Sequence, residues 1–507
     1  MAEQNNNEIP VQPRRQPPSY LGWAIFFGCA FAAVGLGWLA TTINERRAER
    51  IEARVQFVRP ISEWEPDNAK WGESFPREYN SWKATEQMAE NTRYGGSGYR
   101  DYLKAEPNLV VMWAGYAFAK GYSQARGHYH AVEDVTETVR ISEKSPATCW
   151  TCKSPDVPRL MSEMGPARFY ASKFSDFKGK ITHPIGCADC HDNKTMALRI
   201  SRPALREAFQ RQGRNIDNAS LQEKRTLVCA QCHVEYYFKG KKENYLTFPW
   251  DKGQTADAME TYYYQDKGEM PHVDFTHAIS GAKMIKMQHP DYELYSQGVH
   301  AFRNVSCADC HMPYTSEGGI KYTDHQIRSP LYNMSASCQV CHRWSEDELR
   351  TRVYGIQDKN REMLTGAATT ITAAHLEIGE AMKAGATDAE LARTRDLVSR
   401  AQMYWDYVAA ANGMGFHAPQ EAARVLGKAA RLGSQSRLET TRVLARHGRL
   451  GPVTMPDIST VEKAQAYIKP FVTAQAAALE KEKAQRADKA EQESKAREKA
   501  MGGTNPL

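Results

Sequence analysis

Five cysteine pairs of the form C-x-x-C are the residues in this 507-residue chain whose type and spacing could carry chemistry. Lys153 follows the first pair, in the stretch ATCWTCKSPD. Histidine follows each of the other four, in CADCH (187–191), CAQCH (229–233), CADCH (307–311) and CQVCH (338–342). Because the chain has only 15 histidines, four such neighbours are not a chance outcome, and the histidine belongs to the motif.

Cysteine pairs of this kind serve two main chemistries. Two pairs, or one pair with distant histidines, hold a structural zinc ion, and oxidised pairs form disulfides. C-x-x-C-H instead attaches a c-type haem, because the two thiols bond the macrocycle and the histidine binds its iron. The four histidines favour covalent haem over zinc or disulfides. The predicted attachment residues are Cys187, Cys190, His191, Cys229, Cys232, His233, Cys307, Cys310, His311, Cys338, Cys341 and His342.

Lys153 sets the first pair apart. The simplest interpretation is a fifth haem bonded to Cys149 and Cys152, with Lys153 as iron ligand; a redox dithiol or a degenerate site is the alternative. A lysine must lose its proton to bind iron, and burial and a metal ion both favour that loss. Proteins change the axial ligand where a haem performs chemistry. We therefore predict one catalytic haem and four that relay electrons.

A single segment could place these sites at a membrane. Residues 20–43 carry no charge and are long enough to span the hydrocarbon core of about 30 Å. Arg14 and Arg15 precede them, which predicts a cytoplasmic N-terminus and a body in the periplasm. We expect an uncleaved single-pass anchor; a cleaved signal peptide and acylation of Cys29 are the alternatives. The net charge of +6 does not indicate nucleic acid binding, because the propionates of five haems would reverse its sign.

The last third of the chain has no cysteine, and its residue pattern predicts helices. Residues 348–385 and 388–413 place apolar side chains at helical spacing, with glycine near their ends. The haem motifs occupy 149–342 at irregular intervals, which excludes a regular repeat. The C-terminal part is therefore expected to form long helices, in addition to the one N-terminal transmembrane helix.

Four stretches resemble one family. CWTCKSPDVPR, CHVEYYF (232–238), KMQHP (286–290) and KYTDH (321–325), with four C-x-x-C-H sites in this order, are similar to the pentahaem cytochrome c nitrite reductases over about residues 75–470. That family reduces nitrite to ammonium. The resemblance implies a mostly α, multihaem cytochrome c fold with a haem-packed core, and a homodimer formed through the long C-terminal helices. Many relatives pair with a membrane-bound, quinol-oxidising cytochrome c as electron donor.

The resulting organisation has six segments. They are a disordered cytoplasmic tail (1–19), the anchor (20–43), a stem (44–74), a pentahaem catalytic region (75–345), a helical dimerisation region (346–475) and a charged tail (476–507).

Opposite ligands for the four histidine-bound irons follow from the resemblance alone. Eleven histidines remain for four places, and spacing does not choose among them. The resemblance implies His325 for the second haem in chain order, His128 for the third, His417 for the fourth and His300 for the fifth. The histidines without an assigned role are His130, His183, His272, His277, His375 and His447.

The resemblance also implies a pocket over the Lys153 haem. Arg140 would hold nitrite and stabilise anionic intermediates, since its charge is fixed. His289 would donate a hydrogen bond to a nitrite oxygen and deliver protons, and Tyr236 would supply a proton or hydrogen atom.

A calcium ion is implied beside that pocket. Its ligands would be Glu235, the carbonyl oxygens of Tyr236 and Lys286, and Gln288, a hard oxygen set that suits calcium. Glu235 as a surface partner of a lysine is the alternative.

Two other functions stay open at this point. A pure electron-transfer cytochrome would have six ligands on every iron, and the CWTCK motif argues against it. A related reductase acting on hydroxylamine or sulfite would use the same pocket.

Overall fold

The computed structural model describes residues 19–54, 57–265 and 270–501. The chain divides into two compact units, Met1–Val58 and Arg59–Leu507. The predicted disordered tail (1–19) lies outside the described residues, except for its last residue, which begins the first helix.

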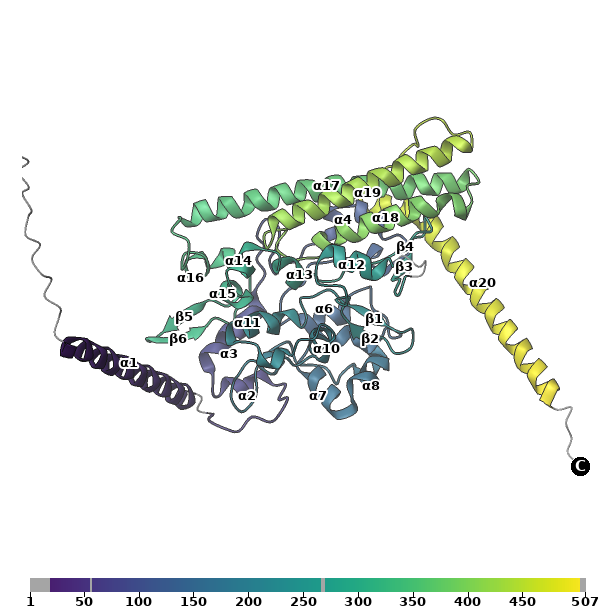
Figure 1. Ribbon diagram of the computed structural model, residues 1–507. Helices are drawn as coiled ribbons and strands as arrows, with labels where there is room; N and C mark the ends of the chain where they lie inside the picture. Colours follow the sequence, from purple (N-terminus) through teal and green to yellow (C-terminus); the bar gives the residue numbers. More distant parts are fainter. Residues whose placement is uncertain (1–18, 55–56, 266–269, 502–507) are drawn as a thin grey trace, which may run out of the picture. The chain divides into compact units, whose positions relative to one another are not determined.

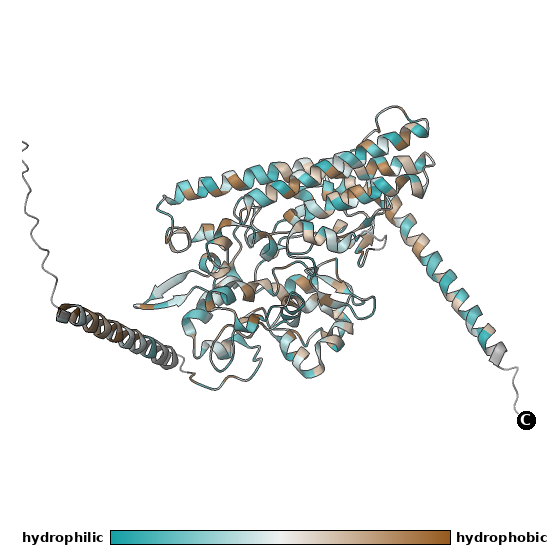
Figure 2. Ribbon diagram, viewed as in Figure 1, coloured by the Kyte–Doolittle hydropathy of each residue, from teal (hydrophilic) through white to brown (hydrophobic). Residues whose placement is uncertain are grey.

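Helix α1 (Ser19–Arg54) is the described part of the first unit (Figure 1). Within it, Tyr20–Glu45 is long and apolar enough to cross a membrane, with a mean hydropathy of 1.9. Figure 2 shows this apolar stretch in brown. The helix continues through the charged residues that follow, so the first part of the predicted stem is helical.

Short helices joined by loops make up the first part of the second unit. Their bounds are α2 Asn68–Gly72, α3 Pro76–Lys83, α4 Tyr102–Ala105, α5 Asn108–Met112, α6 Ala131–Glu137, α7 Asp156–Met164, α8 Pro166–Ala171, α9 Cys187–Cys190, α10 Pro203–Arg211, α11 Leu221–Ala230, α12 Ala256–Tyr263, α13 Asp291–Tyr295, α14 Val299–Phe302, α15 Cys307–His311 and α16 Met334–Ser337. The 3₁₀ turns are η1 Ala84–Gln87, η2 Ala117–Ala119, η3 Ala147–Trp150, η4 Phe174–Phe177, η5 Ile216–Asn218 and η6 Pro330–Tyr332.

Three antiparallel hairpins are the strands in the described residues. They are β1 (Tyr237–Lys239) with β2 (Tyr245–Thr247), β3 (Phe275–Thr276) with β4 (Lys283–Met284), and β5 (Tyr314–Glu317) with β6 (Ile320–Thr323). They are short, and the helices dominate the fold.

Both CADC stretches form one turn of helix, because the motif supplies its own cap. Asp189 accepts a hydrogen bond from the amide of Gly186 at 2.8 Å, and Asp309 accepts one from the amide of Ser306 at 2.7 Å. The acidic residue thereby satisfies an amide at the helix start. Residues three apart on a helix share a face, so the turn presents both thiols in one direction.

Three long helices, α17 (Glu346–Lys383), α18 (Asp388–Ala409) and α19 (Pro419–Arg446), pack against one another in the C-terminal part (Figure 1). The first two begin with capping boxes, in which Ser345 pairs with Glu348 and Thr387 with Glu390. The first ends two residues before its predicted end at 385, and the second ends at Ala409 instead of 413. Buried alanines and leucines fill the space between the three helices.

Helix α20 (Val461–Met501) follows as one helix with Pro470 inside it. Ala464 and Ile468 are buried and the residues from 473 to 497 are half-buried or exposed. The predicted charged tail is thus helical as far as the structure describes it, and Figure 2 shows hydrophilic residues along this helix in teal.

Candidate haem-binding and active site

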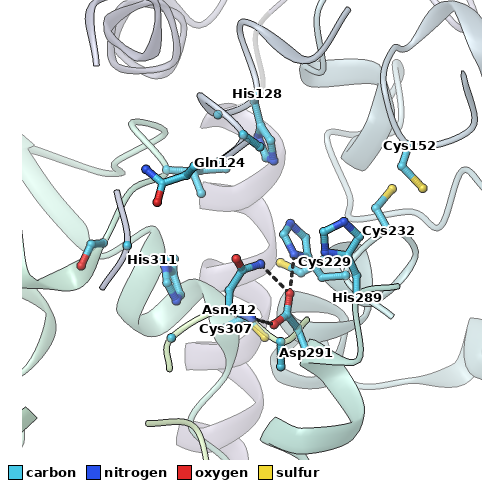
Figure 3. Close-up of a pocket in the computed structure, with 18 of the residues that line it drawn as sticks. Gln124, His128, Cys152, Cys229, Cys232, His289, Asp291, Cys307, His311 and Asn412 are labelled. Carbon is cyan, nitrogen blue, oxygen red and sulfur yellow. Dashed lines mark hydrogen bonds and ion pairs between the residues drawn. The ribbon is translucent and has the colours of Figure 1, made fainter. Parts of the chain in front are cut away.

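A cavity of about 2360 Å³ runs through the second unit. Ligand pockets for one small molecule measure about 300–1,000 Å³, so this cavity has room for several large groups. All ten motif cysteines line it, together with the residue that follows each pair. Figure 3 shows Cys152, Cys229, Cys232 and Cys307, which come from three different motifs, around one part of it.

The cysteines do not form zinc sites or disulfides in the described residues. All eleven are free thiols. No group of three or more His, Cys, Asp and Glu side chains in the described ranges could hold a metal ion. Thiols of different motifs approach each other, Cys152 with Cys232 and Cys229 with Cys307. The attachment sites therefore adjoin one another along a shared cavity.

Three pairs of histidines face each other across this cavity at a constant separation. The ring centres are 6.2 Å apart for His191 and His325, 6.3 Å for His311 and His417, and 6.4 Å for His300 and His342. Histidine nitrogens bind metals at about 2.0–2.1 Å, so two rings on opposite sides of one metal have centres roughly 6 Å apart. These pairs are the ones implied for the second, fourth and fifth haems, and their spacing fits an iron between them.

The outer ring nitrogen of several of these histidines is held by the chain. Nδ1 of His191, His311 and His325 lies 2.7–3.0 Å from the carbonyl oxygens of Met196, Arg328 and Thr323 respectively. Such a bond fixes the tautomer and leaves Nε2 for a metal. Burial lowers the pKa of His191 and His311 to about 4, which keeps the rings neutral, the form that binds metals.

Most histidines without an assigned role show the opposite arrangement. Their Nε2 atoms already have partners in the protein: Glu86 for His130, Asp274 for His272, Val111 for His277, Gln402 for His375 and Glu390 for His447. Nδ1 of His183, the sixth, lies 3.0 Å from Asp156. A bonded Nε2 thus distinguishes five of these six histidines from the cavity histidines His191, His311 and His325.

His233 faces two rings. Its ring centre lies 6.2 Å from that of His289, and the ring of His128 is near enough for the two charges to interact. The 6.2 Å to His289 matches the separation within the three pairs, so this spacing alone does not identify His128 as the opposite partner of His233. Nδ1 of His233 donates to Asp291 at 2.9 Å, and Asp291 also accepts two bonds from Asn412 (Figure 3). Burial opposes protonation of His233, but the bond to Asp291 outweighs it and raises the pKa.

The residues predicted for the catalytic pocket line the same cavity. Lys153 is half-buried there, in the loop between η3 and α7. Arg140 stacks its guanidinium over Phe118 at 4.5 Å and interacts electrostatically with Tyr236. Burial lowers the pKa of Arg140, raises that of Tyr236 well above its ordinary value, and lowers that of His289 to about 3. The structure thus brings these four residues to one cavity.

The predicted calcium ligands are adjacent in space. Glu235 is fully buried; its Oε2 accepts from the amide of Gln288 at 2.5 Å, while its Oε1 has no hydrogen-bond partner among the described residues. The Gln288 side chain lies 2.9 Å from the Lys286 carbonyl oxygen. Burial, with the nearby charge of Glu293, raises the pKa of Glu235 well above its ordinary value. An unsatisfied carboxylate oxygen beside carbonyl oxygens fits a hard cation such as calcium.

Sequence reasoning missed how the segment before His289 is held. The amide of Lys286 donates to Asp274 at 2.8 Å, and that of Met287 donates to Asp406 at 2.9 Å. Glu235 accepts a hydrogen bond from the amide of Gln288, so three carboxylates bind the amides of three successive residues. Asp406 also forms a buried ion pair with the Lys286 amine at 3.0 Å. Asp406 lies on α18, so a helix of the C-terminal part positions the segment that carries His289.

The known proteins that this chain resembles in sequence belong to one family. The family model for cytochrome c552 matches residues 67–500. Cytochrome c-552 of Parabacteroides distasonis is 49% identical over 470 residues, covering 91% of this chain and 94% of the relative. Cytochrome c-552 of Bacteroides fragilis is 48% identical over 457 residues, covering 89% and 92%.

A solved structure shares the fold. The catalytic subunit of cytochrome c nitrite reductase from Desulfovibrio desulfuricans, which has two calcium sites, superimposes with a TM-score of 0.73. It is 34% identical, and the match covers 78% of this chain and 90% of that chain. The predicted fold, mostly helical with the architecture of a multihaem cytochrome c, is confirmed, as is the predicted family resemblance. This chain belongs to the cytochrome c552 family.

Proposed function

We propose that this protein reduces nitrite to ammonium at the site of Lys153, as a cytochrome c nitrite reductase. The observation that carries the proposal is the shared cavity: the one motif that ends in lysine opens onto the same space as Arg140, Tyr236 and His289. The four motifs that end in histidine line that space as well, and three of them face a second histidine at the spacing of a doubly ligated iron. One site is thereby set apart for substrate and four for electrons.

Five covalently bound haem c groups fit the cavity and its thiols. When bound, they supply redox-active iron, which receives electrons and passes six of them to one nitrite. Lys153 would ligate the first iron as a neutral amine, and the cysteines of each motif would fix the macrocycle. His128, His300, His325 and His417 would complete the coordination of the other four irons.

The side chains of the pocket have separate tasks. Arg140 is held against Phe118, so its positive charge stays in one place and attracts the nitrite anion. His289 is neutral at physiological pH because its pKa is about 3, so it orients nitrite by donating a hydrogen bond. The charge of a bound anion favours protonation of this ring, which lets it deliver a proton as the N–O bond breaks. Tyr236 keeps its proton, since its pKa is raised, and can supply it later.

Calcium would act on the geometry of the pocket. Glu235, the carbonyl oxygens of Tyr236 and Lys286, and Gln288 would hold it. Two of the ligands lie in the segment that precedes His289, and one is Tyr236 itself. The ion would therefore fix both catalytic side chains and add positive charge near the substrate.

The setting of the enzyme is part of the proposal. α1 would serve as an uncleaved single-pass anchor with the body in the periplasm, since Arg14 and Arg15 precede its apolar part. A homodimer through the long helices of 346–475 and a quinol-oxidising membrane cytochrome as electron donor complete this assignment. No role in nucleic acid binding is proposed.

The decisive experiment measures ammonium produced from nitrite by the purified protein with its haems, next to an electron paramagnetic resonance spectrum. Near-complete conversion to ammonium, five haems per chain and one high-spin iron are the expected results. A spectrum in which every haem is low-spin would identify an electron-transfer cytochrome instead. Higher turnover of hydroxylamine or sulfite than of nitrite would reassign the substrate.

A further inference from the structure

Arg202 is a buried charged residue that is none of the residues proposed to bind haem, nitrite or calcium. Its side chain is only 2% exposed. It lies directly before α10, and all three groups of its guanidinium have partners. A buried charge is costly unless every donor is satisfied, so an arginine in this position has a specific task.

Apart from its neighbour Ser201, the partners of Arg202 lie in or directly after the first two attachment motifs. Nε donates to the carbonyl oxygen of Thr151 at 2.7 Å, and Nη2 donates to that of Ser154 at 2.9 Å. These two carbonyls stand on either side of Cys152 and Lys153. Nη2 also pairs with Asp189 at 2.6 Å, inside the first CADCH motif. A single side chain therefore binds the Lys153 loop and the second attachment site.

The third motif joins the same network through Gln231. Its side-chain oxygen accepts from the amides of Ser201 and Arg202 at 3.0 and 3.1 Å. Its side-chain nitrogen donates to the carbonyl oxygen of Asp189 at 2.9 Å. Thr151, Asp189 and Gln231 all occupy the position before the second cysteine of their motifs. The residues between the cysteines thus connect three attachment sites in space.

The positive charge of Arg202 reaches the same three attachment motifs. The charge of Arg202 acts on the thiols of Cys152, Cys190 and Cys232, one from each of these three motifs. A fixed positive charge favours the reduced state of a nearby redox group, and interactions in a buried site are little screened by salt.

The second CADCH motif provides a natural comparison. Its Asp309 pairs with Arg225 at 3.0 Å, and that side chain is 11% exposed and lies over the ring of Tyr314. Gln222 donates to the same carboxylate at 2.6 Å. Arg225 bonds to no backbone carbonyl among the described residues. The same pentapeptide therefore pairs in one place with an arginine that also binds backbone carbonyls of another motif, and in the other with an arginine of α11 that binds its carboxylate alone.

We propose that Arg202 is a positioning residue for the Lys153 site: it holds the loop 151–154 so that Lys153 meets the first iron, and it raises the reduction potential of the first three sites. The proposal rests on the proposed function in one respect, the ligation of iron by Lys153. Loss of Arg202 leaves the buried carbonyl of Thr151 without its donor and leaves that of Ser154 with the amide of Val157 alone, which frees the loop to shift.

The test uses the full protein with its haems in three variants: Arg202→Met, Arg202→Lys and, as the matched control, Arg225→Met. Haem content, the high-spin resonance signal and a potentiometric titration of that signal are measured for each. Arg202→Met should retain five haems, alter the signal and lower the reduced-to-oxidised ratio of the first site at a fixed potential about tenfold, equivalent to about 59 mV. Arg202→Lys should keep the potential, because it keeps the charge, but alter the signal, because it reaches fewer carbonyls. Arg225→Met should change neither.

Wild-type signals and potentials in both Arg202 variants would overturn the proposal, and so would an equal change in Arg225→Met. If Arg202→Met loses haem, the high-spin resonance signal of Arg202→Lys decides the test. An altered signal supports the proposal, and an unaltered signal overturns it. Ammonium formation by the wild type tests the proposed function separately. A wild type that forms no ammonium, with a signal that still depends on Arg202, would reject the reductase and retain the positioning role.

Discussion

Buried histidines are used in opposite ways where the long C-terminal helices pack on the protein and where the cavity lies. His375 of α17 stacks on His277 with ring centres 3.7 Å apart, and both nitrogens of each ring are bonded to the protein. His191 and His311 are held at Nδ1 only, and they face a cavity of about 2360 Å³. The chain fills the interior of the helical part with its own side chains, whereas in the catalytic region it builds a lining for groups that it does not encode.

This difference predicts unequal dependence on haem. The side chains that line a cavity of about 2360 Å³ lack packing partners on one side unless haem fills it. Without attached haem the region 75–345 should therefore collapse or unfold. The helices α17, α18 and α19 bury alanine and leucine against one another and should keep much of their helical structure.

Expression without haem attachment would test this largest effect. Limited proteolysis should leave a protected fragment near residues 346–446, and circular dichroism should retain helix but lose cooperativity. Equal proteolysis of both regions would show that the helical part also depends on haem.

The next largest effect concerns the ligand of the first iron. Lys153→His should keep five haems but lose most nitrite turnover, because the catalytic site acquires the ligand of the relay sites. Absorption spectra and ammonium assays measure the two properties. Full turnover with full haem content would remove Lys153 from the mechanism.

Distance alone does not show whether His289 acts on nitrite or ligates an iron, because its ring centre lies 6.2 Å from that of His233. If it acts on nitrite, His289→Asn should lower nitrite turnover about 10²–10⁴-fold, the usual span for a positioned acid–base group. Hydroxylamine turnover should fall much less, because hydroxylamine carries its own protons. The low-spin spectrum should be unchanged.

A variant with an altered low-spin spectrum would instead make His289, at 6.2 Å from His233, the opposite ligand of the third haem. His128→Asn is the paired control. It should alter that spectrum, because His128 is the ligand that we propose.

Asp406 connects helix α18 with the segment that carries His289. Its loss should therefore lower both stability and nitrite turnover, but less than the changes above. Asp406→Leu leaves the Lys286 amine buried without its partner, which costs about 3–5 kcal/mol of stability. It also releases the amide of Met287, so nitrite turnover should fall about tenfold. Adding Lys286→Met should restore much of the stability, because both charges are then absent, but not the turnover. Recovery of both properties would show that Asp406 acts on stability alone.

The sequence predicts the parts that depend on local patterns. The spacing of Cys149, Cys152 and Lys153 predicts an attachment site, and apolar side chains at helical spacing predict the helices that the structure has as α17 and α18. Asp406 and Arg202 were not found this way. Each looks like an ordinary charged residue in a polar stretch, and its role comes from contacts 119 and 51 residues away along the chain.

The smallest predicted effect lies within the helical region and concerns stability. Replacing His375 by leucine leaves Ser280 and Gln402 without their partner, which should cost about 1–3 kcal/mol. Nitrite turnover of the folded protein should be unchanged, because both ring nitrogens serve the protein interior. His447→Leu is the control: that side chain is 23% exposed, so its loss should cost less.

The stability that His375 contributes should depend on pH. Burial lowers the pKa of His375 to about 4, below the 6.5 of an unfolded histidine. Between these values the unfolded chain binds a proton that the folded protein excludes, so the contribution of His375 is complete above pH 6.5 and decreases as the pH falls toward 4. Urea unfolding should therefore show a difference between wild type and His375→Leu that narrows from pH 7 to pH 5. A difference that stays constant or widens over this range would mean that His375 is protonated in the folded state, and the contrast with the histidines of the cavity would then rest on position alone.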